Sequence, residues 1–369
     1  MKIVRSLIRI LLLLVVSFLF LVFVAPSIFP DISPDDRLGN FSPEKITDMH
    51  VHIAGLGYGD SGCFVGNSLA SSFKKPVYLK AFNVSEEELK AFGDQILVKK
   101  VSNMVSESRF VESAVILAMD GYFEKTGAMN QDKTQIFVPN KYVLEETKKY
   151  SNLLYGASIN PYRKDAIELL HEAKKDGAVL VKWIPSIMNI DPSDPILIPF
   201  YKTLTSLDLP LLTHAGQERS FAHADDTLGD PKRLELPLSL GVRIIAAHIA
   251  TTGQIEEQEM IDRLLPLFSK YPNLFADFSS LTQINKLSYL DQGLLNINLH
   301  DRILYGSDWP LQFFPLVSPW YFPTRLSIRN MHYINSQNNS LDRDVLLKFA
   351  LGVPERSFGN TKRILNINM

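Results

Sequence analysis

Cysteine and net charge are the two scarce quantities in this chain of 369 residues. The single cysteine, Cys63, excludes an intrachain disulfide and leaves the redox compartment undefined, and a small buried side chain is its simplest interpretation. The formal net charge is only −2, so the charge balance does not point to nucleic acid or an anionic surface as a partner. There is no internal repeat and no low-complexity tract. Apolar residues make up 46% of the chain and charged residues 21%, which is typical of a globular protein with a full core.

The sequence has one long hydrophobic run, and it lies at the N-terminus. Three basic residues precede it (Lys2, Arg5 and Arg9), and the stretch from Ile10 to Pro30 contains no charge. As a helix, its most apolar part, residues 10–25, would be about 24 Å long, slightly less than the ~30 Å hydrocarbon core of a bilayer. A run without a polar face does not fit a soluble core helix, so we expect a segment that targets the chain to a membrane.

Two kinds of targeting segment fit residues 1–30. One is a cleaved signal peptide, because Ala25-Pro26-Ser27 offers a cleavage site of the small-x-small type. The other is an uncleaved membrane anchor that extends to about Ile28. In both cases the basic end stays in the cytoplasm, so the rest of the chain is expected on the extracytoplasmic side, membrane-anchored or exported. Residues 31–45, rich in Pro, Asp and Ser, are expected to form a linker.

Residues 46–369 alternate short apolar runs with amphipathic segments. Eight runs have the composition of buried strands: 46–53, 113–119, 152–159, 177–184, 209–214, 242–248, 273–278 and 302–308. Buried strands that alternate with helices indicate a parallel sheet, and eight of them predict an α/β fold of the (β/α)8 TIM-barrel type. Helical spacing is found in 143–150, 166–175 and 254–267, and two last helices near 341–350 and 354–365 would close the base of the barrel. Residues 54–112 are expected to be a loop followed by helices.

Side chains that can bind metal stand at the ends of these runs. His50 and His52 lie one residue apart, and because strand side chains alternate, both rings point to the same face. Further candidates lie in runs four, five, six and eight: Lys182, His214, His248 and Asp308. Each alone is more simply explained as a structural residue. Because the C-terminal strand ends of a TIM barrel meet at one rim, however, together they predict a divalent metal site.

At this point the chain resembles the amidohydrolase superfamily of metal-dependent hydrolases, in its amidohydrolase 2 branch. The order matches: a His-x-His after strand one, a His after each of strands five and six, and an Asp after strand eight. The segments that carry the resemblance include Asp48-Met49-His50-Val51-His52, Leu212-Thr213-His214, Gly306-Ser307-Asp308-Trp309-Pro310 and the closing Phe358–Leu365. The similarity runs from about Ile46 to Ile367.

The resemblance implies a small-molecule substrate and one or two divalent ions, most simply zinc. His50, His52, His214 and Asp308 would hold an ion, and His248 would be a ligand of a second ion or a catalytic acid or base. In members with two ions a strand-four lysine is carbamylated and bridges them, whereas in many one-ion members a similar lysine is structural or contacts substrate. The role of Lys182 therefore stays open, as does a homo-oligomer.

The expected chemistry is hydrolysis of an amide, ester or lactone. An ion lowers the pKa of its bound water to about 7. Asp308 would hold this water and take its proton as general base, His248 would orient or stabilise the substrate oxygen, and either could return a proton to the leaving group. The alternative is a metal-dependent decarboxylase of the same branch. A non-catalytic, membrane-tethered binding protein is a third, less favoured interpretation.

The loop after the fifth run carries further candidates. Gln217, Glu218 and Arg219 would face the site, and Arg219 could bind a substrate carboxylate or phosphate. A surface ion pair of Arg219 with Glu218 or Asp225 is the simpler expectation.

Three aromatic residues neighbour predicted site residues in the sequence. Trp183 should point away from the site toward the helices, because it follows Lys182 on the same strand. Trp309 could line the pocket, since it lies beyond the end of strand eight. Tyr122, after strand two, is a weaker candidate of the same kind.

Overall fold

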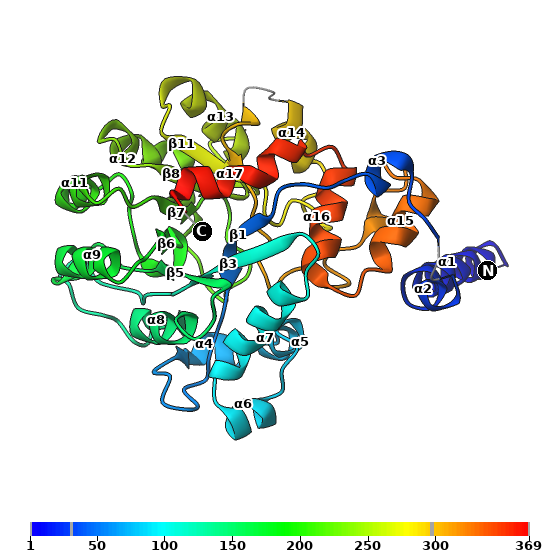
Figure 1. Ribbon diagram of the computed structural model, residues 1–369, viewed down its shortest axis with the longest axis horizontal. Coiled ribbons are helices and arrows are strands. Elements are labelled where there is room, and N and C mark those ends of the chain that lie inside the picture. Colours follow the sequence, from blue (N-terminus) through cyan, green and yellow to red (C-terminus); the bar gives the residue numbers. More distant parts are fainter. Residues whose placement is uncertain (1, 30–31, 296–298, 368–369) are drawn as a thin grey trace.

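The eight apolar runs form eight parallel strands, as predicted. The computed structural model describes residues 2–29, 32–295 and 299–367 (Figure 1). The barrel strands are β1 (Ile46–His52), β3 (Val111–Leu117), β5 (Leu153–Ala157), β6 (Leu180–Trp183), β7 (Leu211–His214), β8 (Ile244–Ala247), β11 (Leu274–Asp277) and β12 (Ile303–Leu304). They are hydrogen-bonded in the order β1-β3-β5-β6-β7-β8-β11-β12, so each barrel strand lies beside the next along the chain.

The last strand returns to the first and closes the barrel. The backbone amide of His52 donates to the carbonyl of Trp309 at 2.9 Å, and the amide of Asp308 donates to the carbonyl of His50 at 2.9 Å. Val51 and Trp309 also form a parallel bridge. The (β/α)8 TIM barrel is therefore confirmed. Its closure places the C-terminal end of β1 beside the residues that follow β12.

Helices surround the strands, as Figure 1 shows. The outer layer contains α7 (Gln95–Ser106), α8 (Asn140–Thr147), α9 (Ala166–Lys175), α11 (Ile198–Ser206), α12 (Glu235–Ser239), α13 (Met260–Lys270), α14 (Tyr289–Leu295) and α16 (Ser340–Ala350). The connections contain α3 (Asp36–Gly39), α10 (Pro185–Met188), α15 (Ile328–Asn335), η2 (Pro195–Leu197), η3 (Asp226–Gly229), η4 (Pro231–Leu234), η5 (His248–Ala250) and η7 (Pro319–Tyr321). The helices expected at 143–150, 166–175 and 341–350 correspond to α8, α9 and α16.

The helix expected over residues 254–267 is partly wrong. Its first part is a small hairpin of β9 (Gln254–Ile255) and β10 (Gln258–Glu259), and α13 begins only at Met260. Glu256 and Glu257 both have positive φ angles, of 52° and 61°. Two successive residues with positive φ are the conformation of a tight two-residue hairpin turn, and it cannot be continued as an α-helix.

The base of the barrel is closed by one terminal helix rather than two. Ile364 and Leu365 of α17 (Glu355–Leu365) join the apolar cluster inside the barrel. The other buried members of that cluster come from the strands: Met49, Val115, Leu117, Leu180, Leu212, Ile245, Ala247 and Leu304. α16 instead packs in the outer layer, where Val345 and Leu346 join the larger cluster between strands and helices. The base is thus filled with aliphatic side chains, which leaves the opposite rim for polar groups.

A roof over this rim is built from residues 54–97, which form a loop followed by helices as predicted. The roof contains α4 (Asn67–Ala70), α5 (Lys74–Ala81) and α6 (Glu86–Phe92). Its strand β2 (Phe64–Val65) pairs antiparallel with β4 (Ile136–Phe137), the excursion after the second barrel strand. Cys63 is a buried free cysteine, as expected, and lies in this roof.

Residues 36–41 of the expected linker pack against the barrel. The Asp35 side chain accepts a hydrogen bond from the amide of Leu38 at 2.9 Å and caps α3. Leu38 and Phe41 are buried, and Phe41 stacks on Phe349 of α16 with ring centroids 3.9 Å apart. This segment therefore belongs to the outer layer in its packing.

The N-terminal run is a single largely exposed helix. It comprises α1 (Lys2–Leu19), the π-helical turn η1 (Phe20–Val24) and α2 (Ala25–Ile28). In Figure 1 it lies outside the ring of helices, beside α15, where the Asn335 side chain donates to the carbonyl of Val22 at 2.7 Å. The 25 residues from Val4 to Ile28 are long and apolar enough to cross a membrane, and a signal sequence would meet the same description.

Candidate metal centre

His50 and His52 occupy the end of β1 and face the interior of the rim together. Their Nε2 atoms are 3.1 Å apart. The His50 side chain is fully buried, and that of His52 is 20% exposed. The alternation of strand side chains thus brings the two rings together as the sequence predicts.

Asp308 completes a triangle of donor atoms with these two histidines. It lies just after β12 with a positive φ of 61°, an uncommon conformation for a residue other than glycine. Its Oδ1 is 3.5 Å from the Nε2 of His50 and 3.5 Å from the Nε2 of His52. Donors held at about 2.1 Å around a tetrahedral ion lie about 3.4 Å apart, so the three separations fit a shared divalent ion.

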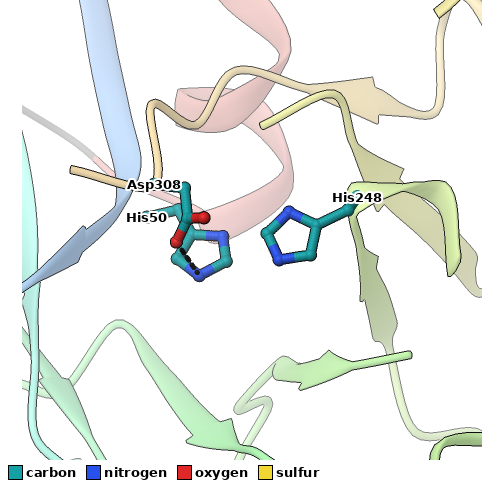
Figure 2. Close-up of side chains that lie close together, drawn as sticks. All are labelled: His50, His248 and Asp308. Carbon is teal, nitrogen blue, oxygen red and sulfur yellow. Dashed lines mark ion pairs between the residues drawn. The ribbon is translucent and has the colours of Figure 1, made fainter. Parts of the chain in front are cut away.

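His248 approaches the same point from the opposite side of the rim (Figure 2). It follows β8 in a turn where His248, Ile249 and Ala250 all have positive φ, between 50° and 56°. Its ring stacks beside that of His50 with centroids 5.3 Å apart. One donor atom from each of His50, His248 and Asp308 can be chosen so that all three lie within 4.8 Å of one another.

His214 lies at the end of β7, next to His248, with ring centroids 5.2 Å apart. Its Nδ1 is 3.5 Å from a carboxylate oxygen of Glu218. Its Nε2 is buried and has no hydrogen-bond partner among the described residues. A buried ring nitrogen without a hydrogen-bond partner destabilises a fold unless a ligand binds it. A histidine that binds a metal ion has such a nitrogen when the ion is absent.

Lys182 of β6 lies in the floor of the site. Its Nζ is 3.0 Å from the Nε2 of His50, and only 1% of the residue is exposed. Burial lowers the pKa of Lys182 to about 8, although the carboxylates of Asp308 and Asp277 favour the ammonium. All six residues predicted for the site therefore converge at one rim.

Asp277, the last residue of β11, was missed by the sequence reasoning. Its Oδ2 is 2.8 Å from the Nδ1 of His50, and its Oδ1 accepts from the backbone amide of His248 at 2.8 Å. Its position at the end of the seventh predicted strand was a usable signal. A carboxylate that holds the far nitrogen of a ligating imidazole fixes the orientation and tautomer of the ring.

Two serines after β11, also missed, complete the hydrogen-bond network. Ser279 donates to Oδ1 of Asp277, and its Oγ is 2.7 Å from the Nδ1 of His248. Because the serine proton goes to the carboxylate, Oγ must accept from the Nδ1–H of His248. The Nε2 lone pair of His248 is then left for the cavity, whereas that of His50 faces the Nζ of Lys182 at 3.0 Å. Ser280 donates to Oδ2 of Asp308, which leaves Oδ1 toward the histidines.

The electrostatics of the rim favour metal-binding protonation states. Burial lowers the pKa of all four histidines, so their imidazoles are neutral and offer a lone pair (His50, His52, His214 and His248). Asp308 is the exception, because burial raises its pKa to about 7, against the hydrogen bond from Ser280, and so disfavours the carboxylate until a cation is bound. The donor set, the buried His214 nitrogen without a partner in the described part of the chain and the separations together fit a divalent cation.

A cavity of about 160 Å³ opens above these residues. Its floor contains the six predicted residues, and its far wall is apolar and comes largely from the roof, with Leu69, Leu79, Phe82, Val84 and Leu89 among its members. Gln217, Glu218 and Arg219 also line the cavity, as expected for the loop after β7. The expected ion pair of Arg219 is wrong, because its guanidinium donates to Oε1 of Gln217 at 2.7 and 2.9 Å.

The aromatic candidates lie around the cavity rather than in it. Trp183 packs against Phe200 in the helix layer, as predicted, and its Nε1 donates to the carbonyl of Ile159 at 2.8 Å. The expectation for Trp309 is wrong, because it lies behind the cavity-lining Phe82, with ring centroids 5.2 Å apart. Tyr122 is also absent from the lining and lies beside Lys133.

Comparison with solved structures finds the same fold. An uncharacterized TIM-barrel protein from Bordetella bronchiseptica is 14% identical, with 87% of this chain and 98% of that chain covered and a TM-score of 0.53. A protein assigned as a 2-pyrone-4,6-dicarboxylic acid hydrolase from Pseudomonas putida is 12% identical, with 88% and 98% covered and a TM-score of 0.49. The manganese-bound 5-carboxyvanillate decarboxylase from Novosphingobium aromaticivorans is 11% identical, with 88% and 97% covered and a TM-score of 0.45.

Comparison of sequences carries the family assignment. No curated protein matches the chain. The family model described as amidohydrolase matches residues 109–315, which is more than half of the 369 residues. The matched region includes Lys182, His214, His248 and Asp308, and the resemblance noted from the sequence is confirmed. The chain belongs to the amidohydrolase family.

Proposed function

We propose that this protein is a metal-dependent hydrolase that cleaves an amide, ester or lactone bond of a small molecule. The observation that carries the proposal is the triangle of His50 Nε2, His52 Nε2 and Asp308 Oδ1, with separations of 3.1, 3.5 and 3.5 Å. Membership of the amidohydrolase family supports an enzymatic role. The ligands in this proposal are His50, His52, His214 and Asp308, and zinc is the ion that best suits imidazole and carboxylate donors.

A bound divalent ion would polarise a carbonyl oxygen and lower the pKa of a coordinated water to about 7. Asp308 would accept the proton of the attacking water; this role is supported by its hydrogen bond from Ser280 to Oδ2, which leaves Oδ1 toward the histidines. In the metal-free site burial raises its pKa to about 7. In this proposal the carboxyl takes the proton of the water and gives it to the leaving group. His248 presents an Nε2 lone pair, which suits a ligand or a proton acceptor.

Replacing Asp308 by Asn tests the role of this carboxylate. We expect Asp308→Asn to keep much of the bound metal while kcat falls by about 10²- to 10⁴-fold, the usual contribution of a general base. Metal content by mass spectrometry and turnover of p-nitrophenyl esters and aryl lactones would be measured together. Asp120→Asn is the matched control, since Asp120 is a buried carboxylate that binds Arg163 away from the cavity. Full activity of Asp308→Asn contradicts the proposal.

The alternative reaction class is a decarboxylase of the same family. The same donor set could polarise a substrate beside a carboxylate that leaves as carbon dioxide. Incubation with small carboxylic acids, with carbon dioxide measured in the headspace, separates the two. Carbon dioxide release without ester, amide or lactone hydrolysis would replace the hydrolase proposal, and turnover of either kind excludes a purely binding role.

The number of ions depends on Lys182. A carbamylated Lys182 would bridge two ions, and the 3.0 Å contact of its amine with His50 in the floor of the site supports this role. Metal analysis of the wild type and Lys182→Ala decides the question. Two ions per chain falling to one or none supports the bridge, and one ion in both proteins rejects it.

We further propose that the N-terminal helix tethers or exports the barrel. Its length, composition and low burial support this role. Carbonate extraction of membranes and N-terminal sequencing of the mature protein separate the two forms. An intact N-terminus in the extracted pellet indicates an anchor, and a new N-terminus near Ser27 indicates a cleaved signal peptide.

A further inference from the structure

Lys286 is a cavity-lining lysine that the proposed mechanism does not use. It lies on the loop between β11 and α14 and is half-buried. Among the described residues, its side chain has no hydrogen bond and no ion pair. Lys75, another lysine that lines the cavity, instead pairs with Glu86 at 3.0 Å. Lys286 is therefore a cavity-lining cation that no anionic side chain of the described residues neutralises.

The charges around the cavity indicate what that partner is. Apart from the paired Lys75, the cations are Lys182, Arg219 and Lys286, and the carboxylates are Asp308, Glu218 and Asp277. These three positive and three negative side chains balance, so a divalent ion leaves two positive charges in excess. With two ions and a carbamylated Lys182 the excess is the same, because the lysine charge changes sign as the second ion enters. A negatively charged substrate group would reduce this excess in either case.

The loop of Lys286 is tied to the catalytic carboxylate. Ser280 donates to Asp308, and the Nε2 of Gln283 donates to the Oγ of Ser280 at 3.0 Å. The backbone amide of Lys286 then donates to the carbonyl of Gln283 at 2.8 Å. A group bound by Lys286 would consequently be held at a fixed position relative to the reacting centre.

The surroundings favour a carboxylate over a more highly charged group. Arg219 is held by Gln217 through its Nε and one Nη2–H group, so among the described residues Lys286 is the unpaired ammonium of the lining. Burial lowers the pKa of Lys286, while Asp308 and Glu218 oppose the shift, so an added anion would stabilise its charged form. Across the cavity the roof presents aliphatic and aromatic side chains such as Leu79 and Phe82.

We propose that Lys286 binds a carboxylate of the substrate, and that the substrate is a small apolar molecule carrying this group beside its scissile bond. The reaction named in this inference rests on the proposed hydrolase function. The binding of a carboxylate by Lys286 does not depend on that function. Lys286 would act as the residue that selects anionic over neutral substrates, through a charge-assisted hydrogen bond.

A pair of probes that differ only in charge tests the proposal without turnover. Calorimetry on the full-length protein in detergent would compare 4-phenylbutanoate with 4-phenylbutanamide, in metal-loaded and metal-free samples. We expect the carboxylate to bind at least tenfold more tightly in both samples. Lys286→Met should reduce this preference to less than threefold, and Lys286→Arg should retain it. Lys75→Met, which removes a lysine that already has a partner, is the matched control and should behave like the wild type.

Three results would overturn the proposal. One is an unchanged preference in Lys286→Met, and a second is the same loss in Lys75→Met. The third is a preference that disappears when the metal is removed, because the carboxylate would then bind the ion itself.

Failure of the proposed hydrolase function has a different signature. In that case no ester, amide or lactone is turned over, but the charge preference of the wild type and its loss in Lys286→Met persist. Conversely, equal kcat/KM for an ester that carries a free carboxylate and for its neutral amide analogue, in wild type and Lys286→Met alike, would leave the hydrolase standing and remove the role of Lys286.

Discussion

Lys182 and Lys348 are both fully buried lysines, but they lie in polar clusters of opposite kinds. Lys348 of α16 donates to Oδ2 of Asp344 at 2.6 Å and to the carbonyl of Gly306 at 2.9 Å, and Tyr305 donates to the same carboxylate oxygen at 2.9 Å. Its charge is therefore compensated inside the fold. Lys182 contacts a neutral imidazole at 3.0 Å instead of a carboxylate.

The difference separates structural polar clusters from binding sites. In the Lys348 cluster, one ammonium meets one carboxylate, and aromatic rings of Phe278 and Tyr305 lie 5.5 and 5.1 Å from the ammonium. At the rim, several nitrogens face the cavity, and the buried Nε2 of His214 has no partner among the described residues. One buried acceptor of the Lys348 cluster, Oδ1 of Asp344, also has no partner among the described residues. The contrast therefore lies in charge, because the ammonium of Lys348 meets a carboxylate, whereas the ammonium of Lys182 meets neutral imidazole beside a cavity.

The largest effect should come from breaking the cluster of Lys348, Asp344 and Tyr305, called the closed cluster because its ammonium is already paired with a carboxylate. Lys348→Met leaves Asp344 buried without its cation, so we expect the free energy of unfolding to fall by about 3–5 kcal/mol. Chemical denaturation followed by circular dichroism measures it. Adding Asp344→Asn to Lys348→Met should recover part of the loss, because the orphaned charge is then removed. If Lys348→Met costs less than 1 kcal/mol, the contrast between the two clusters does not hold.

Metal should stabilise the cluster of polar side chains at the rim, called the open cluster, and leave the closed cluster around Lys348 unaffected. A ligand at 100 times its Kd adds about 2.7 kcal/mol to the stability of the state that binds it. We expect zinc to raise the unfolding free energy of wild type and of Lys348→Met by the same amount, measured in chelator-treated protein with and without added zinc. His52→Gln should lose most of this gain. An equal gain in His52→Gln would show that the ion binds elsewhere.

Asp277→Asn should have a smaller effect, because Asp277 orients ligands without being one in the proposed site. An Asn can still accept one hydrogen bond, but it no longer favours the required His50 tautomer. We expect metal affinity to fall about 10- to 100-fold, the usual cost of losing such a partner. Competition with a chromophoric chelator gives the affinity. Asp120→Asn should leave metal affinity unchanged, and an equal loss in both variants would indicate a general loss of structure.

The strands and most of the rim could be predicted because they depend on local pattern. A strand buried on both faces is a continuous apolar run, and a parallel barrel places every polar residue at a run's C-terminal end on the same rim. His50, His52, Lys182, His214, His248 and Asp308 could be recognised in this way.

The rest depends on contacts between distant segments. Asp277 looks like an ordinary strand-terminal carboxylate until it meets His50, 227 residues away in the sequence. Lys286 lies on a loop with no periodic pattern, and the apolar wall is formed by roof helices whose placement follows from packing. The turn at Glu256 and Glu257 was missed because its positive φ angles occur at residues that usually favour helices.

Lys182→Met should have the smallest effect on stability, although Lys182 is as deeply buried as Lys348. Burial lowers its pKa to about 8, from an ordinary value of 10.5. Below pH 8 the charged side chain therefore destabilises the folded protein, and this destabilisation decreases as the pH rises from 8 to 10.5. Removing the amine at pH 7 should therefore change the unfolding free energy of the metal-free protein by less than about 1 kcal/mol, or raise it. Denaturation of metal-free wild type, Lys182→Met and Lys348→Met in parallel measures the contrast directly. A loss of 3 kcal/mol or more in Lys182→Met would mean that the nearby carboxylates already compensate this lysine, and the rim would then be a closed cluster before any metal binds.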